Sequence, residues 1–273
     1  MSESGGPDLL VRARAALLDA LDALAVHRRA VVVIGAQAIY LHTGGVALAL
    51  AETTKDSDLA LDPRSLGDHP LLEDAMRAAG FELDRRAGQP GIWINAEGIP
   101  VDLMCPEALS GPGGRRGARV PPHSNRSMRR ASGLEATVVD HRPMRIAALA
   151  PGDGRVRVAQ VASPAALLVS KVFKIAEREQ DPGRLADKDA HDLYRILAGV
   201  SREDLCGSLS WLREDPLAGE VTRSALTSLE RLFGAGPDTL GSRMAGRAEE
   251  GVGDPEVVSA SVAVLARDLL EAL

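Results

Sequence analysis

The chain has 273 residues and a mass of 28.7 kDa, a length that allows one large domain or two modest ones. Apolar residues make up 45% of it and charged residues 26%, a balance that excludes a disordered or fibrous protein. The formal net charge of −6 argues against a surface that is basic throughout, so any contact with nucleic acid must be local.

The sequence gives no sign of a membrane or of an oxidising compartment. Its longest apolar stretch, residues 30–41, is shorter than the roughly 20 residues that a membrane-spanning helix needs. The first residues lack the basic and apolar segments of a secretory signal, so we expect a cytoplasmic protein with no membrane partner. Cys105 and Cys206 are too few for a disulfide framework and have no zinc-site spacing, so we expect ordinary buried cysteines.

The first half of the chain alternates helical and extended patterns. Apolar residues at helical spacing predict a helix over 8–25, and a β-branched run over 30–34 ends at Gly35, where a helical pattern over 36–42 follows. Further along, the patterns predict a strand over 53–61, a helix over 71–79, and strands over 91–95 and 100–104. This alternation predicts an α+β (α/β) fold, with a small mixed sheet and helices.

The second half becomes mainly helical. Residues 111–132 are rich in Gly, Pro, Ser and Arg, which predicts an irregular loop, and residues 134–139 and 155–161 are predicted strands. Ser163 can cap a helix that starts at Pro164. We place a domain boundary there, between a domain over 1–162 and a helical C-terminal domain over 163–273. In the latter a flexible link over 234–246 precedes a last helix over 257–272.

Two aspartates on the predicted strand over 53–61 carry the clearest chemical signal. Successive side chains of a strand alternate between its faces, so Asp56 and Asp58 are expected to point the same way. Two carboxylates so close repel each other unless a divalent cation neutralises them, and oxygen ligands alone suit Mg²⁺. The alternative is an acidic pair that faces solvent at the edge of the strand.

Two further features support a site near these aspartates. Gly35, between a strand and a helix, lets a phosphate approach the backbone, and the amides at the start of the helix can bind it. Asp102 is flanked by apolar residues on the predicted strand over 100–104, where an unpaired carboxylate is costly to bury. Asp102 could instead be an edge-strand or turn residue.

The order of these features resembles the nucleotidyltransferase fold, and more closely the AbiEii-type nucleotidyltransferase-like toxins of type IV toxin-antitoxin systems. The resemblance covers residues 30–200. It rests on Gly35-Ala36, on Thr54 to Asp58, on Lys171 and on the segment Lys188 to Tyr194. It implies that residues 1–162 form a nucleotidyltransferase-like catalytic domain.

The resemblance also implies roles for single residues. Asp56 and Asp58 would hold Mg²⁺ and the nucleotide phosphates, and Asp102 would complete a second metal site or accept a proton from the attacking hydroxyl. The remaining residues of the implied nucleotide-binding and catalytic set are Gly35, Ala36, Thr54, Lys171 and Asp192. Ala36 departs from the family pattern, in which a serine or a second glycine follows the turn glycine, and it offers a phosphate no hydroxyl.

The lysines of the helical half have a structural alternative. Lys171 and Lys174 share one helical face, as do Asp189 and Asp192. Lys171 is expected to neutralise the triphosphate, whereas Lys174 and Asp189 are expected to form a salt bridge between helices. His191 is expected on a helix surface.

The implied reaction moves a nucleotide from an NTP to a hydroxyl group and releases pyrophosphate. RNA, and tRNA in particular, is the acceptor that the resemblance suggests, and an antitoxin protein is the implied partner. The arginines between residues 115 and 130 could grip a phosphodiester backbone or could lie on a solvated loop. The alternative function is a non-catalytic protein of the same fold that binds a nucleotide or a partner, because Ala36 impairs the site.

Overall fold

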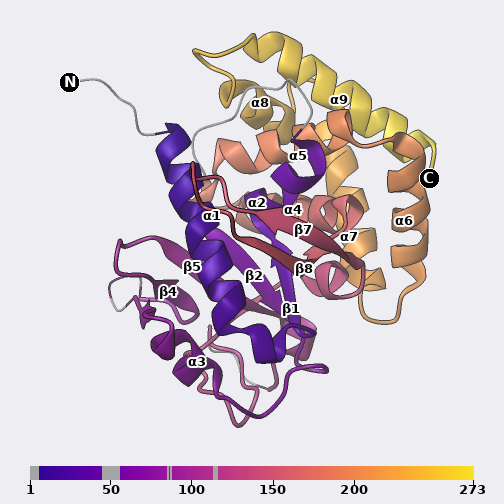
Figure 1. Cartoon of the computed structure of the whole chain (residues 1–273). Coiled ribbons are helices and arrows are strands. Elements are labelled where there is room, and N and C mark those ends of the chain that lie inside the picture. Colours follow the sequence, from indigo (N-terminus) through magenta and orange to yellow (C-terminus); the bar gives the residue numbers. More distant parts are fainter. Residues whose placement is uncertain (1–5, 45–55, 85, 87, 113–115) are drawn as a thin grey trace. The chain divides into compact units, whose positions relative to one another are not determined.

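The computed structural model describes residues 6–44, 56–84, 86, 88–112 and 116–273 (Figure 1). The chain divides into two compact units, of which the first holds Met1–Ala38 and Thr53–Ala162 and the second Ile39–Glu52 and Ser163–Leu273. Helix α2 (Gly35–Thr43) begins in the first unit and ends in the second. Among the helices described, none is long and apolar enough to cross a membrane.

A mixed sheet forms the centre of the first unit. Its described strands are β1 (Val31–Ile34), β2 (Ser57–Leu61), β3 (Glu82–Leu83), β4 (Ile92–Ile94), β5 (Pro100–Pro106), β6 (Arg129–Ala131), β7 (His141–Ala147) and β8 (Val156–Ala162). The order is β3-β4-β5-β2-β1-β8-β7, and β6 pairs with β5. The β1–β8, β2–β5 and β5–β6 pairs are parallel, whereas β1–β2, β3–β4, β4–β5 and β7–β8 are antiparallel. Strand β1 is buried along its whole length, as its four apolar residues predict for a central strand.

Helix α1 (Gly6–Ala23) covers one face of this sheet, and helix α3 (Leu72–Ala78) contacts α1. The short 3₁₀ turns η1 (Ala25–His27), η2 (Glu107–Leu109) and η3 (Glu135–Val138) lie at other points of the unit. Helix α1 packs against β2, β5 and β8 (Figure 1). The Ser57 hydroxyl of β2 donates to the carbonyl oxygen of Ala13 in α1 at 3.0 Å. The face of β2 that carries Ser57 is therefore the face that α1 covers.

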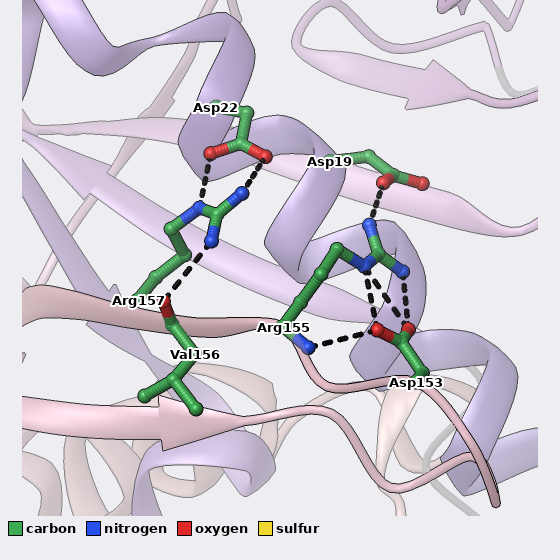
Figure 2. A network of polar contacts seen from close by, with 6 residues as sticks. All are labelled: Asp19, Asp22, Asp153, Arg155, Val156 and Arg157. Atoms are coloured by element: carbon green, nitrogen blue, oxygen red, sulfur yellow. Dashed lines mark hydrogen bonds and ion pairs between the residues drawn. The ribbon is translucent and has the colours of Figure 1, made fainter.

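Ion pairs also join α1 to β8 (Figure 2). Arg155 contacts Asp19 of α1 and Asp153 of its own hairpin, at 2.5 and 2.7 Å. Arg157 pairs with Asp22 at 2.5 Å. Hydrogen bonds from these arginines lower the pKa values of Asp153 and Asp22. The pairs fix which part of α1 lies beside β8.

The second unit is helical. Its described elements are α4 (Pro164–Arg178), η4 (Pro182–Arg184), α5 (Asp187–Gly199), α6 (Arg202–Glu214), α7 (Gly219–Leu229), a π-helical turn η5 (Glu230–Gly234), α8 (Leu240–Arg247) and α9 (Pro255–Glu271). The predicted start of α4 is confirmed, because the Ser163 hydroxyl accepts a hydrogen bond from the Ala166 amide and Pro164 opens the helix. The expected fold class, a mixed sheet with helices followed by a mainly helical part, is confirmed.

Three predictions of local structure are wrong. Within the predicted strand over 134–139, Glu135–Val138 form the 3₁₀ turn η3, in which the Thr137 hydroxyl donates to the Leu134 carbonyl. Residues 234–246 are not a flexible link, since most of them belong to α8. Within 111–132, residues Arg129–Ala131 form strand β6 instead of a loop. The predicted strand over 53–61 begins at Ser57 in the described part of the chain, and residues 53–55 lie outside it.

Candidate functional site

Asp58 and Asp102 lie side by side on one face of the sheet. Strands β2 and β5 are parallel, and Asp58 is aligned with Asp102 in their register. Aligned residues of neighbouring strands project from the same face. Asp58 follows Ser57, so this face, which we call the Asp58 face, is opposite to the one that α1 covers. The resemblance to the nucleotidyltransferase fold implies that the strands of these two acids are neighbours, and the pairing of β2 with β5 confirms it.

Gly35 adjoins the Asp58 carboxylate. Its φ of +67° lies in the left-handed region, where glycine is favoured, and it connects β1 directly to α2. A Cβ at this position would overlap the Asp58 carboxylate and would lie 2.9 Å from its Cγ. Asp58 therefore lies against the start of α2, where the first N–H groups of a helix have no acceptor within the helix. Ala36 follows with no hydroxyl, so Gly35 and Ala36 offer a phosphate only their backbone groups.

A buried arginine lies behind the same turn. Arg14 of α1 is 5% exposed and donates from Nε to Gln37 Oε1 at 2.8 Å and from Nη1 to the Ala147 carbonyl at 3.0 Å. Burial lowers the pKa of Arg14. Gln37 belongs to the first turn of α2, so Arg14 brings a positive charge close to the residues after Gly35. Sequence reasoning missed this residue, because nothing in the local pattern of α1 distinguishes it.

Asp102 pairs with an arginine that sequence reasoning also missed. Arg129 Nη2 lies 2.5 Å from Asp102 Oδ2, and the two side chains are 23% and 14% exposed. Arg129 comes from the segment 111–132, in which the sequence has several arginines and no acidic residue. That imbalance was the available signal, because half-buried arginines in such a segment need carboxylates from elsewhere.

The other predicted residues of the first unit are less well defined. Asp56 precedes β2 by one residue and is half-buried, so the alternation of a strand does not fix its direction. Thr54 lies outside the described residues. In the part of the chain that the structure describes, no three His, Cys, Asp or Glu side chains are grouped to hold a metal ion. The carboxylates of Asp58 and Asp102 remain a fitting set for Mg²⁺, which usually takes one or two carboxylates together with water and substrate phosphates.

The predicted residues of the second unit form a buried cluster of charges. Lys171 Nζ of α4 lies 2.7 Å from carboxylate oxygens of both Asp189 and Asp192 in α5. The predicted pair of Lys174 and Asp189 is confirmed, at 2.8 Å. Burial by itself would lower the pKa of Lys171 and raise that of Asp189, but the opposite charges outweigh it, so the first is raised and the second lowered. This cluster holds α4 to α5, and the catalytic roles of Lys171 and Asp192 stay predictions.

His191 is not on a helix surface. Its side chain is fully buried, and Nε2 lies 2.5 Å from Glu249 Oε1. The prediction failed because α5 packs against α4, α8 and α9, which leaves it little free surface. Arg195 of the same helix is also buried, with its guanidinium 5.3 Å from the centre of the Tyr40 ring.

A family model described as nucleotidyltransferase matches residues 12–205. That range includes Gly35, Asp58 and Asp102 of the first unit and the Lys171 cluster of the second. No curated protein and no solved structure matches the chain.

Proposed function

The chain belongs to a nucleotidyltransferase family, and from this we propose that it transfers a nucleotide from an NTP to a hydroxyl group with the help of Mg²⁺. The observation that carries the proposal is the alignment of Asp58 with Asp102 on the Asp58 face, next to the Gly35 turn. The family match supports a transferase. The metal, the acceptor and the closer relationship to AbiEii-type toxins are our proposal.

The residues of the Asp58 face have complementary tasks in this reaction. Asp58, with Asp56 before it, would hold Mg²⁺, which when bound neutralises phosphate oxygens and orients the α-phosphate for attack. The N–H groups at the start of α2 would bind the phosphate chain, and the buried charge of Arg14 would favour its negative charge. Asp102, beside Asp58, would accept the proton of the attacking hydroxyl group. Lys171 and Asp192 keep the catalytic roles that the resemblance implies.

An RNA acceptor, with tRNA as the first candidate, agrees with the charge of the segment that leads to β6. Arg116, Arg119 and Arg126 are exposed there. Exposed arginines can bind a phosphodiester backbone without reading its sequence. We further propose that this activity makes the protein the toxin of a pair and that an antitoxin protein restrains it.

A second candidate function follows from Ala36. The turn lacks a hydroxyl at this position, so the site could bind a nucleotide without transferring it. Both functions need the backbone amides of α2, and only transfer needs Asp58 to act on the phosphate.

Incubation with each NTP, labelled at its α-phosphate, with Mg²⁺ and total tRNA distinguishes the two. We expect label in RNA, dependent on Mg²⁺, and a loss of about 100-fold or more for Asp58→Asn. Asp74→Asn is the matched control, because Asp74 is exposed and pairs only loosely with Arg77, at 3.6 Å. Bound nucleotide without transfer would support the second candidate, and labelled protein would indicate a protein acceptor.

A further inference from the structure

The Asp58 face already contains a cation. We propose that Arg129 is a positioning residue for Asp102, whose carboxylate it holds in place beside Asp58, so that the face takes a single divalent cation rather than two. This role rests on the proposed function, because it concerns the same face of the sheet.

Arg129 reaches Asp102 along one face of the sheet. In the parallel β5–β6 pair Arg129 is aligned with Met104, which projects from the same face as Asp102. Its Nη2 donates to Asp102 Oδ2 at 2.5 Å and contacts Met104 Sδ at 2.8 Å. With 23% and 14% of the two side chains exposed, the pair is shielded from bulk water but not sealed from it.

The segment before Arg129 is anchored on its way to the sheet. The Gly91 amide donates to the Arg126 carbonyl at 2.9 Å, and the Trp93 indole donates to the Ser127 carbonyl at 3.0 Å. The Ser127 hydroxyl donates to the Glu73 carboxylate at 2.6 Å. These contacts bind the segment to β4 and α3, so the position of the arginine does not depend on its ion pair alone.

Gly91 allows the close approach of this segment. Its φ is +81°, and a Cβ there would lie 2.5 Å from the Arg129 amide nitrogen and would overlap the Leu103 carbonyl oxygen. Only glycine fits a position with that backbone conformation and that contact. The backbone of Arg129 can therefore lie directly against β5, which brings its guanidinium within reach of Asp102.

The charges explain what the pair does. Neighbouring strands are about 5 Å apart, so ionised Asp58 and Asp102 repel each other unless a cation intervenes. A guanidinium hydrogen-bonded to a carboxylate is a strong, permanently charged partner. A second divalent cation at Asp102 would have to share its carboxylate with Arg129, and the two positive charges would repel each other. Arg129 thus supplies the charge that a second metal would otherwise provide.

The ratio of Mn²⁺ to nucleotide on the protein tests this role without relying on activity. We would measure it by equilibrium dialysis with Mn²⁺ and a non-hydrolysable NTP analogue. The wild-type protein and Arg129→Lys are expected to bind one Mn²⁺ for each bound analogue. Arg129→Met is expected to bind a second, and the further change Asp102→Asn to remove it again. Arg77→Met, at an exposed arginine of α3 that pairs only loosely with Asp74 at 3.6 Å, is the matched control and should behave as wild type.

The possible outcomes separate this role from the proposed function. Two Mn²⁺ per analogue in the wild type would overturn the role of Arg129 alone, and this count needs no variant, so it stands even if Arg129→Met fails to fold. A folded Arg129→Met that still binds one Mn²⁺ would also overturn it. Bound analogue without Mn²⁺, or no bound analogue, would overturn the proposed function together with it.

Discussion

The Asp58 carboxylate lies against Gly35, in the space that a Cβ at that position would fill. The strand that carries Asp58 pairs with β1, in which Ile34 is aligned with Asp58, so the acid meets the chain where it turns from strand to helix. A carboxylate and the first N–H groups of α2 are thereby held at one point. The proposed metal and phosphate contacts depend on this arrangement.

Gly35→Ala should therefore impair both stability and nucleotide binding. A left-handed φ costs a residue other than glycine about 1–2 kcal/mol, and the added methyl group must also displace Asp58. Gly98→Ala is the matched control, because Gly98 has a φ of +74° and nothing within 4 Å of its would-be Cβ. Urea unfolding and nucleotide titration of both variants measure the difference. Equal effects of the two changes on nucleotide binding would contradict the role of the Gly35–Asp58 contact.

Lys171→Met should destabilise the second unit strongly. It leaves the buried Asp189 and Asp192 without their shared cation, and removing one partner of a buried ion pair typically costs about 3–5 kcal/mol. The side chain of Lys174 is 35% exposed, so Lys174→Met should cost at most about 1 kcal/mol. Denaturant unfolding followed by far-UV circular dichroism gives both values. Equal small losses would mean that the cluster does not hold α4 to α5.

The buried cluster of Lys171, Asp189 and Asp192 should also make the stability of the protein depend on pH in the acid range. The pKa of Asp189 in the folded protein is below its ordinary value of 3.8, so its contribution is fully present above that value and is lost as the pH falls through the folded pKa. Lys171 has a raised pKa, so its contribution is fully present below 10.5 and is lost only at higher pH. Thermal unfolding between pH 2 and 7 should show a steeper acid loss for wild type than for Lys171→Met. Parallel curves would exclude this linkage.

Gly241 and Gly207 should respond in opposite directions to alanine. A Cβ at Gly241 of α8 would overlap the Phe233 ring, so Gly241→Ala should cost about 1–3 kcal/mol through overpacking. Gly207 lies within α6 with open space around its would-be Cβ, so Gly207→Ala should add about 0.5–1 kcal/mol of stability. Melting temperatures decide the matter, and a stabilising Gly241→Ala would contradict the packing of α8 against η5.

The ion pairs between α1 and β8 should contribute modestly to the thermal stability of the protein (Figure 2). Arg155 contacts two carboxylates and Arg157 one, so Arg155→Ala should lower the melting temperature more than Arg157→Ala. Because these side chains are partly exposed, salt should reduce both effects. Melting curves at low and high ionic strength check this, and effects independent of salt would point to packing instead of charge.

Local signals in the sequence were enough to predict the helices and strands that build the site. The β-branched run before Gly35, the helix after it and the strand of Asp102 each have a period or a breaker that acts within a few residues. The same holds for Ser163 and Pro164, which start α4 by direct contact with its first turn. Such features are visible without knowing what lies across the molecule.

Contacts between segments that are far apart in the sequence could not be predicted from these local signals. The partnership of Asp102 with Arg129 and that of His191 with Glu249 each join residues far apart in the sequence. Strand β7 was missed because it contains Pro143 and two arginines, residues that suit an edge strand but weaken the extended pattern. The glycines of α8 indicated a flexible link, whereas Gly241 and Gly246 allow close packing against neighbouring helices.

The most direct test of nucleotide transfer at the Asp58 face is to measure which product contains the α-phosphate of the NTP and which contains the γ-phosphate. The protein would be incubated with Mg²⁺, total tRNA and one NTP, labelled either at its α-phosphate or at its γ-phosphate. We expect the α-label in the acceptor, the γ-label in released pyrophosphate, and neither product with Asp58→Asn. A γ-label in the acceptor, or transfer that survives Asp58→Asn unchanged, would contradict nucleotide transfer at the Asp58 face.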